Sequence, residues 1–382
     1  MTEVIIASAV RTAVGKKNGV FRKVHPIDLA AAVLKEVVHR AGMEAAAVED
    51  VVMGCVSPLK EQGMNIARLS LLRAGYPVTV PGVQINRMCG SGQQAIHFAS
   101  QEIASGDMDV TIGGGVEHMT CVPIGSDGDT STITPELHAQ YTFVHQGVSA
   151  ELVAEKYGVT KAEMDRYALQ SHERAVAAIQ AGCFADEIVG VKGLDKAGNE
   201  IIVTQDEGPR ADTTLDKIAS LQPAFREDGT ITAGNASQVS DGAAAVLLMN
   251  KEKADQLGVK ARGRIVAQTV VGSDPTIMLD GVIPATHKVL NKANLTIKDM
   301  DRIEINEAFA PVVLAWKKET DADLEKVNVN GGAIALGHPL GATGAKLLTS
   351  LLYELERIQG RYGLLTVCIG HGMSTAMIIE RI

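Results

Sequence analysis

The feature that most restricts the fold is an internal repeat at a fixed offset of 252 residues. The segment HRAGMEAAAVEDVVMGC (39–55) aligns without a gap with NKANLTIKDMDRIEINE (291–307), and the two match as helix end, linker and strand in turn. A duplication of this kind predicts two halves of one architecture, because each copy repeats the same order of supersecondary elements.

A second correspondence joins the middle of the first half to the C-terminal end. VTIGGGVEHM (110–119) aligns with VCIGHGMSTAM (367–377), which matches Thr111 with Cys368. In both halves a glycine turn, CGSG (89–92) or GATG (341–344), opens a predicted helix. We therefore expect the two halves to resemble each other from the first strand to the last.

Short apolar runs such as VIIASAV alternate with segments of helical period such as DLAAAVLKEVVHRAG, and this alternation favours a layered α/β fold. A polar stretch (GSDGDTST) and further helical segments interrupt the first half and predict an excursion from it, a plausible lid over a site. We predict an N-terminal half over 1–262, with a core of about 1–117 and 233–262 and an inserted loop domain of about 118–232. The C-terminal half would cover 263–382.

Composition excludes several classes of protein. The 382 residues are 46% hydrophobic, as in globular proteins, and no apolar run approaches the roughly 18 residues of a membrane helix. We therefore expect a cytoplasmic protein with no membrane partner. The net charge of -9 offers no footprint for nucleic acid. Five irregularly spaced cysteines without a CxxC pair argue against disulfides and structural zinc, so we expect no metal and any special cysteine to act as a thiolate.

Two motifs carry the first candidate side chains. In NRMCGSG, Cys89 opens a predicted helix, where unpaired backbone N–H groups stabilise a thiolate and predict a depressed pKa. In GGAIALGHPLGATGA, His338 lies on a glycine-flanked bend, where an imidazole suits proton transfer. Taken singly, each has an ordinary reading: a buried cysteine that caps a turn, and a histidine that packs against one.

Two further motifs lie in the second half. INEAFAPVV places Asn306 and Glu307 at a strand end, where an asparagine could orient a water or the pair could cap the next helix. CIGHGMS places Cys368 at a strand end, followed by glycines whose N–H groups could face an oxyanion. Two activated thiols and a histidine fit acyl-transfer chemistry.

These motifs, in this order, resemble the signature set of the thiolases, enzymes that cleave 3-ketoacyl-CoA with coenzyme A or run the reverse Claisen condensation. The resemblance extends over essentially the whole chain, including GNAS (234–237) and DGAAAVLLM (241–249). It implies two βαβαβαββ halves in a five-layered α-β-α-β-α core with an inserted loop domain. It also implies an acyltransferase with coenzyme A and acyl-CoA as substrates, no other cofactor, and a homotetramer or homodimer.

The resemblance also implies roles for five residues. Cys89 matches the nucleophile that holds the acyl group as a thioester, His338 the base that activates it, and Cys368 the acid and base at the α-carbon of the acetyl unit. Asn306 would hold a water that forms one oxyanion site with His338. The N–H groups of Gly370 and Cys89 would form the other.

Positions that contact coenzyme A are implied by motif within and around the excursion. His145 and Ser237 match residues that line the pantetheine tunnel, and Arg210 matches a cationic contact for the nucleotide end. Phe225 would line the adenine pocket and Met278 the acyl pocket. Each of these five fits ordinary loop chemistry equally well.

The chain departs from the family pattern at two positions. Gln146 follows His145 where thiolases often have methionine, and His371 interrupts what is commonly a run of three glycines. Both changes lie close to the site by motif position and leave the preferred acyl chain open. The segment 119–144 is also shorter than the tetramer-forming loop of acetoacetyl-CoA thiolases, which leaves both dimer and tetramer open.

There are three alternatives to an active thiolase. Ketoacyl synthases and hydroxymethylglutaryl-CoA synthases lack a second cysteine at the position of Cys368. A catalytically impaired thiolase-like protein that binds acyl-CoA or lipid would keep the fold without turnover. A dinucleotide-binding dehydrogenase is disfavoured, because no GxGxxG follows the first strand with an acidic residue about 20 positions later.

Overall fold

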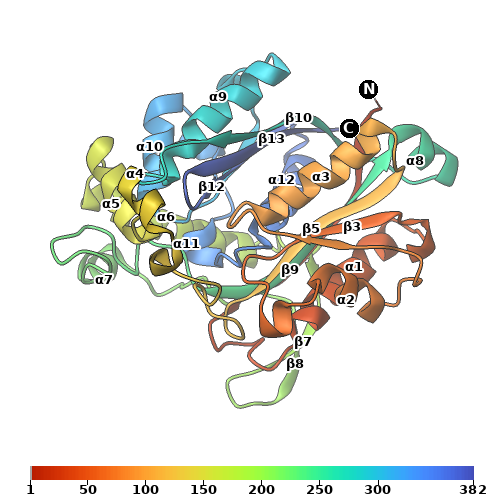
Figure 1. Cartoon of the computed structure of the whole chain (residues 1–382), viewed down its shortest axis with the longest axis horizontal. Coiled ribbons are helices and arrows are strands. Elements are labelled where there is room, and N and C mark those ends of the chain that lie inside the picture. The colour runs from red at the N-terminus through yellow and green to blue at the C-terminus, as the bar shows by residue number, and fades with distance from the viewer. Residues whose placement is uncertain (1) are drawn as a thin grey trace.

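A large twisted sheet with helices on both sides organises the chain (Figure 1). The computed structural model describes residues 2–382. The strands follow the spatial order β11-β12-β13-β10-β1-β9-β5-β3-β4. In chain order they are β1 (Val4–Thr12), β3 (Asp50–Gly54), β4 (Val83–Ile85), β5 (Val110–His118), β9 (Ser240–Asn250), β10 (Gly263–Gly272), β11 (Arg302–Ile305), β12 (Tyr362–Ile369) and β13 (Met373–Arg381). The short strands β2 (Gly15–Lys16) and β6 (Ile188–Val189) pair with β9 and β1.

The strand order is a mirrored duplication. The run β3-β5-β9-β1 of the first half reappears as β11-β12-β13-β10 in the second, with the same parallel and antiparallel pairings. The halves join where β1 and β10 pair antiparallel over Ile5–Arg264 and Ile6–Gly263. The repeat at an offset of 252 is thus a repeat of structure, with β3 over β11.

The second correspondence was placed in the wrong register. Asp50 on β3 pairs with Thr111, and its counterpart Arg302 on β11 pairs with Gly363. Thr111 is therefore equivalent to Gly363, and not to Cys368 as predicted. The error has a simple cause: the glycine runs of the two strands look alike, although they occupy different positions along the pleat.

Five layers follow from the burial of both sheet faces. The outer helices of the first half are α1 (Pro26–Arg40) and α2 (Ile66–Arg73), and those of the second are α9 (Val282–Ala293) and α10 (Ala310–Thr320). Between the two halves of the sheet lie α3 (Ser91–Ser105) and α12 (Thr343–Ile358), as Figure 1 shows. On β1, Ile5 packs in the outer core and Ile6 in the central one, which is why the strand reads as an unbroken apolar run.

The central helices α3 and α12 approach each other through glycines. A Cβ on Gly92 would lie 2.7 Å from the carbonyl oxygen of Gly341, and one on Gly344 would collide with the backbone nitrogen of Gln93. Only residues without a Cβ allow this crossing. It brings the N-terminal ends of both helices, one from each half, to a common point.

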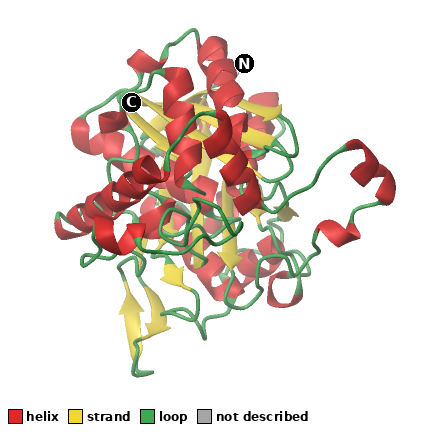
Figure 2. Ribbon diagram, turned by 90° about the vertical axis from the view of Figure 1, so that its left-hand side faces the viewer, coloured by secondary structure: helices red, strands yellow, loops and turns green. Residues whose placement is uncertain are grey.

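The segment between β5 and β9 carries most of the remaining elements. These are α4 (Pro135–Gln140), α5 (Gln146–Lys156), α6 (Lys161–Gln180), the hairpin β7 (Val191–Leu194) and β8 (Glu200–Val203), and α7 (Leu215–Ala219). The hairpin stands out from the body in Figure 2, whereas α5 and α6 pack against α10. The chain also contains α8 (Lys251–Leu257), α11 (Ala333–Leu336) and the 3-10 turns η1 (Ala45–Ala47), η2 (Lys60–Gln62), η3 (Thr130–Thr132), η4 (Leu279–Gly281), η5 (Ile297–Asp299) and η6 (Leu324–Lys326).

A buried ion cluster fixes this excursion to the core. Arg11 of β1 is fully buried and contacts Glu187 at 2.5 Å and both carboxylate oxygens of Asp206 at 2.7 and 2.9 Å.

None of the helices in residues 2–382 combines the length and the apolarity that crossing a membrane requires.

Candidate active site

Cys89 lies on a sharp turn between β4 and α3. Met88, directly before it, adopts a left-handed backbone with φ of 44°, and Ser91 locks the turn by donating its hydroxyl to the carbonyl oxygen of Met88 at 2.6 Å. Gly90 has an ordinary helical φ, so the turn does not require a glycine there. Its lack of a Cβ is needed instead because Ile369 fills the adjoining space.

Burial controls the ionisation of Cys89. The residue is 5% exposed, and removal from water raises its pKa to about 11, although its own backbone N–H, the Gln146 amide and the N–H of Gly370 favour the thiolate. The expected depressed pKa is therefore not met, because desolvation outweighs the donors. A base must take the thiol proton when the sulfur reacts.

His338 is held in one tautomer by its neighbours. The Thr343 hydroxyl donates its single hydrogen to the carbonyl oxygen of Pro339 at 2.9 Å, so it accepts from Nδ1–H of His338 at 2.6 Å. The other ring nitrogen, Nε2, then carries the lone pair and faces Nδ2 of Asn306 at 3.3 Å. Burial and the positive charge of Lys346 lower the pKa of His338 to about 3, so the ring is neutral at rest.

Asn306 lies between His338 and Cys368. Its side chain contacts Nε2 of His338 and favours the thiolate of Cys368, while its Oδ1 is buried without a hydrogen-bond partner. An unpartnered buried acceptor of this kind suits a water or a substrate group that donates to it. Asn306 is fully buried, and its backbone N–H bonds the carbonyl oxygen of Thr366 at 3.0 Å.

Glu307 anchors the loop that carries Asn306. It does not cap the helix that follows it, and its carboxylate instead accepts the N–H of Ile334, in the first turn of α11, at 3.1 Å. Its carboxylate accepts from Tyr167 and Ser171 of α6, both at 2.7 Å, and from Asn328 at 3.0 Å. The following helix starts at Ala310 with no side-chain cap. The capping alternative is thus not met, and the loop is tied to the excursion instead.

Cys368 ends β12, next to the turn with Gly370. Burial raises the pKa of Cys368, and the nearby Cys89 sulfur disfavours a second negative charge, so this thiol rests protonated. A Cβ on Gly370 would lie 2.8 Å from Nε2 of Gln146 and 2.9 Å from Sδ of Met88. The structure therefore brings Cys89, Cys368, His338, Asn306 and Gly370 together at the end of α3, from both halves of the chain.

The five residues predicted to contact coenzyme A divide into separate groups. His145 is the N-cap of α5 and stacks on Phe225 with ring centroids 5.0 Å apart. Ser237 donates its backbone N–H to Ala308 at 2.9 Å, beside the loop of Asn306. Met278 is buried among apolar residues of the second half. Arg210 lines a cavity of about 200 Å³ together with His172 and Lys217, and none of the other four residues lines it.

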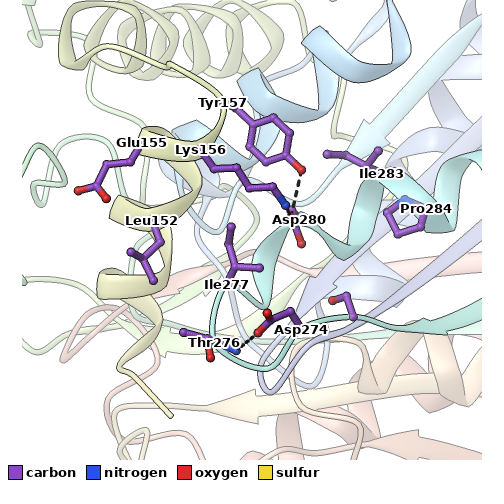
Figure 3. Close-up of a pocket in the computed structure, with 11 residues that line it drawn as sticks. Leu152, Glu155, Lys156, Tyr157, Asp274, Thr276, Ile277, Asp280, Ile283 and Pro284 are labelled. Carbon is purple, nitrogen blue, oxygen red and sulfur yellow. Dashed lines mark hydrogen bonds and ion pairs between the residues drawn. The ribbon is translucent and has the colours of Figure 1, made fainter. Parts of the chain in front are cut away.

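A larger cavity lies elsewhere. Its volume is about 860 Å³, and α5, η4 and the start of α9 surround it, with Lys156 and Tyr157 both pointing at Asp280 (Figure 3). Lys156 contacts Oδ2 of Asp280 at 2.7 Å and the hydroxyl of Tyr157 does so at 3.0 Å. None of the ten predicted site residues lines this cavity.

Sequence reasoning missed Thr343, Lys346 and the placement of Gln146. Thr343 and Lys346 follow His338 within the same motif, but only the fold turns the Thr343 hydroxyl back onto the ring. Gln146 stood out as a departure from the family, whereas its contact with the Cys89 site depends on tertiary packing.

Within residues 2–382, no three His, Cys, Asp or Glu side chains are grouped so as to hold a metal ion.

Known proteins resemble this chain over nearly its full length. The family model "Thiolase, N-terminal domain" matches residues 4–252 and "Thiolase, C-terminal domain" matches 259–381. The steroid 3-ketoacyl-CoA thiolase FadA6 of Mycobacterium tuberculosis is 50% identical, with 100% of this chain and 95% of the relative covered. An acetyl-CoA acetyltransferase of Chromobacterium violaceum is 44% identical over 99% and 100%.

A solved structure gives the same result. The crystal structure of the Bacillus anthracis acetyl-CoA acetyltransferase superimposes with a TM-score of 0.92 at 41% identity, covering 100% of this chain and 99% of the other. The predicted fold class and enzyme class are confirmed, and nothing favours the impaired binding protein. This chain belongs to the thiolase family and is an acyltransferase that moves an acyl group between coenzyme A and the acetyl-CoA carbon.

Proposed function

We propose that Cys89 is the nucleophile, His338 its base and Cys368 the proton carrier at the α-carbon. The observation that carries this proposal is the meeting of two buried thiols and a neutral imidazole from opposite halves of the chain. The thiolase family acts on acyl-CoA and coenzyme A, so the reaction considered is cleavage of 3-ketoacyl-CoA and its reverse.

The first half-reaction forms the acyl-enzyme. Nε2 of His338 accepts the Cys89 thiol proton, and the sulfur attacks the 3-keto carbon of the substrate. The resulting alkoxide faces the N–H groups of Cys89 and Gly370. Removing one such donor typically costs about 100- to 1000-fold in rate.

Carbon–carbon cleavage then leaves the acyl group on Cys89 and an enolate of acetyl-CoA. Nε2–H of His338, with a water at the unpartnered Oδ1 of Asn306, meets the enolate oxygen. Cys368, which rests as a thiol, gives its proton to the α-carbon and acetyl-CoA departs.

The second half-reaction runs the proton transfers in reverse. Coenzyme A enters, its thiol proton passes to Cys368, and its sulfur attacks the Cys89 thioester. Acyl-CoA leaves, and the Cys89 sulfur takes its proton back from His338. Every proton removed is thus returned within one cycle.

The substrate we propose is a 3-ketoacyl-CoA larger than acetoacetyl-CoA, supported by the similarity to the steroid 3-ketoacyl-CoA thiolase at 50% identity. Acetoacetyl-CoA is the second candidate, supported by the names of relatives at 44%. A panel of 3-ketoacyl-CoA thioesters compared by kcat/KM separates them, since one methylene in a pocket is worth about 1 to 3 kcal/mol.

The test of the mechanism is covalent labelling. The Cys89→Ala variant should take up no acyl group from radiolabelled acetyl-CoA, whereas wild type should be labelled at residue 89. Label retained by the Cys89→Ala variant would refute the assignment of the nucleophile.

We further propose that the chain binds coenzyme A through the five predicted contact residues, divides into the predicted domains and forms a homo-oligomer. Support for coenzyme A binding comes from the stacked pair His145 and Phe225 and from the cationic Arg210. A homo-oligomer is supported by exposed apolar side chains such as Val83 on the edge strand β4 and Phe98 on α3. The five free cysteines fit the proposed cytoplasmic location, because thiols stay reduced there.

A further inference from the structure

Gln146 places an amide beside the sulfur of Cys89. It is the first residue of α5, held there by His145, whose Nδ1 accepts the N–H of Gly147 at 3.1 Å. The side chain of Gln146 is half-buried and reaches from α5 to the turn after β12. There its Nε2 covers Gly370, 2.8 Å from the point where a Cβ would lie.

The wall next to the nucleophile is thus made of two unlike side chains. Sδ of Met88 lies 2.9 Å from the same point on Gly370 and supplies an apolar surface. The Gln146 amide supplies a hydrogen-bond donor at the same point on Gly370, the residue whose N–H favours the Cys89 thiolate. Cys89 is 5% exposed, so an acyl group bound to its sulfur is surrounded closely by the neighbouring side chains.

An acyl group on Cys89 changes the surroundings of the amide. When the thioester carbonyl oxygen accepts hydrogen bonds from the N–H groups of Cys89 and Gly370, the rest of the acyl chain extends from the sulfur past Gln146. A plain alkyl chain displaces water from the amide and offers no acceptor in return, which leaves a polar group buried without a partner. A chain with an oxygen at that place restores the hydrogen bond.

From this contact we infer that Gln146 is a specificity-determining residue that selects acyl groups carrying a hydrogen-bond acceptor oxygen a few bonds from the thioester carbon. The inference rests on the proposed role of Cys89 and names the substrate class of that same site. Keto, hydroxyl and carboxylate oxygens share the chemistry that the amide N–H recognises. The size of the acyl chain does not supply this acceptor, because a long hydrocarbon chain and a short one both bury the Gln146 amide without a hydrogen-bond partner.

The experiment compares isosteric acyl donors in a single turnover. The pairs are 4-oxopentanoyl-CoA with 4-methylpentanoyl-CoA, and 5-oxohexanoyl-CoA with 5-methylhexanoyl-CoA, because a methyl group has nearly the size of the keto oxygen. Acyl transfer to Cys89 is followed by mass spectrometry of the intact protein and its peptides. Wild type should be acylated faster by the oxo compound, by about tenfold in at least one pair. A difference of this size is expected when one compound makes a hydrogen bond and the other leaves the buried donor without a partner.

Two variants test whether Gln146 causes the preference. Gln146→Met should bring the rate ratio of that pair close to one, chiefly by slowing the oxo compound and speeding the methyl compound. Gln146→Glu keeps the shape but replaces the donor by an acceptor, and should lower the ratio further. Gln140→Met, the same change on an exposed neighbour at the end of α4, should keep the wild-type ratio.

The outcomes separate this inference from the mechanism it rests on. A wild-type ratio near one in both pairs, or a ratio unchanged in both Gln146 variants, overturns the role of Gln146 while Cys89 remains acylated. Acyl groups found on another residue in wild type overturn the nucleophile and the selectivity together.

Discussion

Nδ1 of His338 lies 2.6 Å from the hydroxyl oxygen of Thr343, and that hydroxyl in turn donates to Pro339. The chain of two hydrogen bonds leaves the lone pair on Nε2, on the side of Asn306. A histidine whose tautomer is fixed in this way presents its basic nitrogen without rearrangement.

Thr343→Val tests this tautomer. The valine removes the acceptor for Nδ1–H and leaves a buried donor unpaired, so kcat should fall by about 10- to 100-fold with little change in KM. Thr349→Val is the matched control, because Thr349 on the same helix is equally buried and donates to Ala345 at 2.8 Å without touching a histidine. Both variants should lose similar thermal stability. Equal kcat values for the two would contradict the role of Thr343.

Cys368→Ser should separate the two half-reactions. A serine hydroxyl is a far weaker acid than a thiol, so exchange of the α-protons of acetyl-CoA in D₂O should fall at least about 100-fold. Acylation of Cys89 should survive. Cys183→Ser, a change at a free cysteine not among the predicted site residues, should exchange at the wild-type rate. Undiminished exchange in Cys368→Ser would remove this residue from the mechanism.

His97 makes stability depend on pH. It is buried on α3 with no partner for Nε2, and burial lowers its pKa from 6.5 to about 3. A depressed pKa contributes stability that is present above pH 6.5 and is lost as pH falls toward 3, because only the unfolded chain takes up the proton. Between pH 7 and 5 this loss is about 2 kcal/mol.

The variant His97→Leu should therefore lose about 2 kcal/mol less than wild type between pH 7 and pH 5. Urea unfolding at the two pH values gives the comparison, and only the difference between them is used. His39→Leu, at an exposed position, serves as the control and should follow wild type. The same pH sensitivity in His97→Leu and wild type would show that the imidazole is not the source.

Arg11→Met should destabilise the fold by about 3 to 5 kcal/mol, because it leaves the buried carboxylates of Glu187 and Asp206 without their cation. Arg73→Met breaks an exposed pair with Asp28 and should cost less than about 1 kcal/mol. Denaturant unfolding measures both. A loss in Arg11→Met no larger than in Arg73→Met would mean that the buried cluster contributes little.

Much of the fold could be predicted because its signals are local. Strands buried on both faces read as apolar runs, and the repeat at an offset of 252 predicts two similar halves, whose strands the structure arranges in mirrored order. The glycine runs were less informative. They suggested a match of Thr111 with Cys368, whereas pairing along the strands matches Thr111 with Gly363.

The duplicated architecture and the candidate site residues could be read from the chain order, since repeat, periodicity and motif are properties of that order. The surroundings of those side chains depend on the folded chain. Burial raises the pKa of Cys89 against the effect of its helix terminus, Thr343 fixes the tautomer of His338, and Gln146 reaches Gly370 from the excursion. Desolvation and contact depend on which distant segments pack together, and no local pattern encodes that.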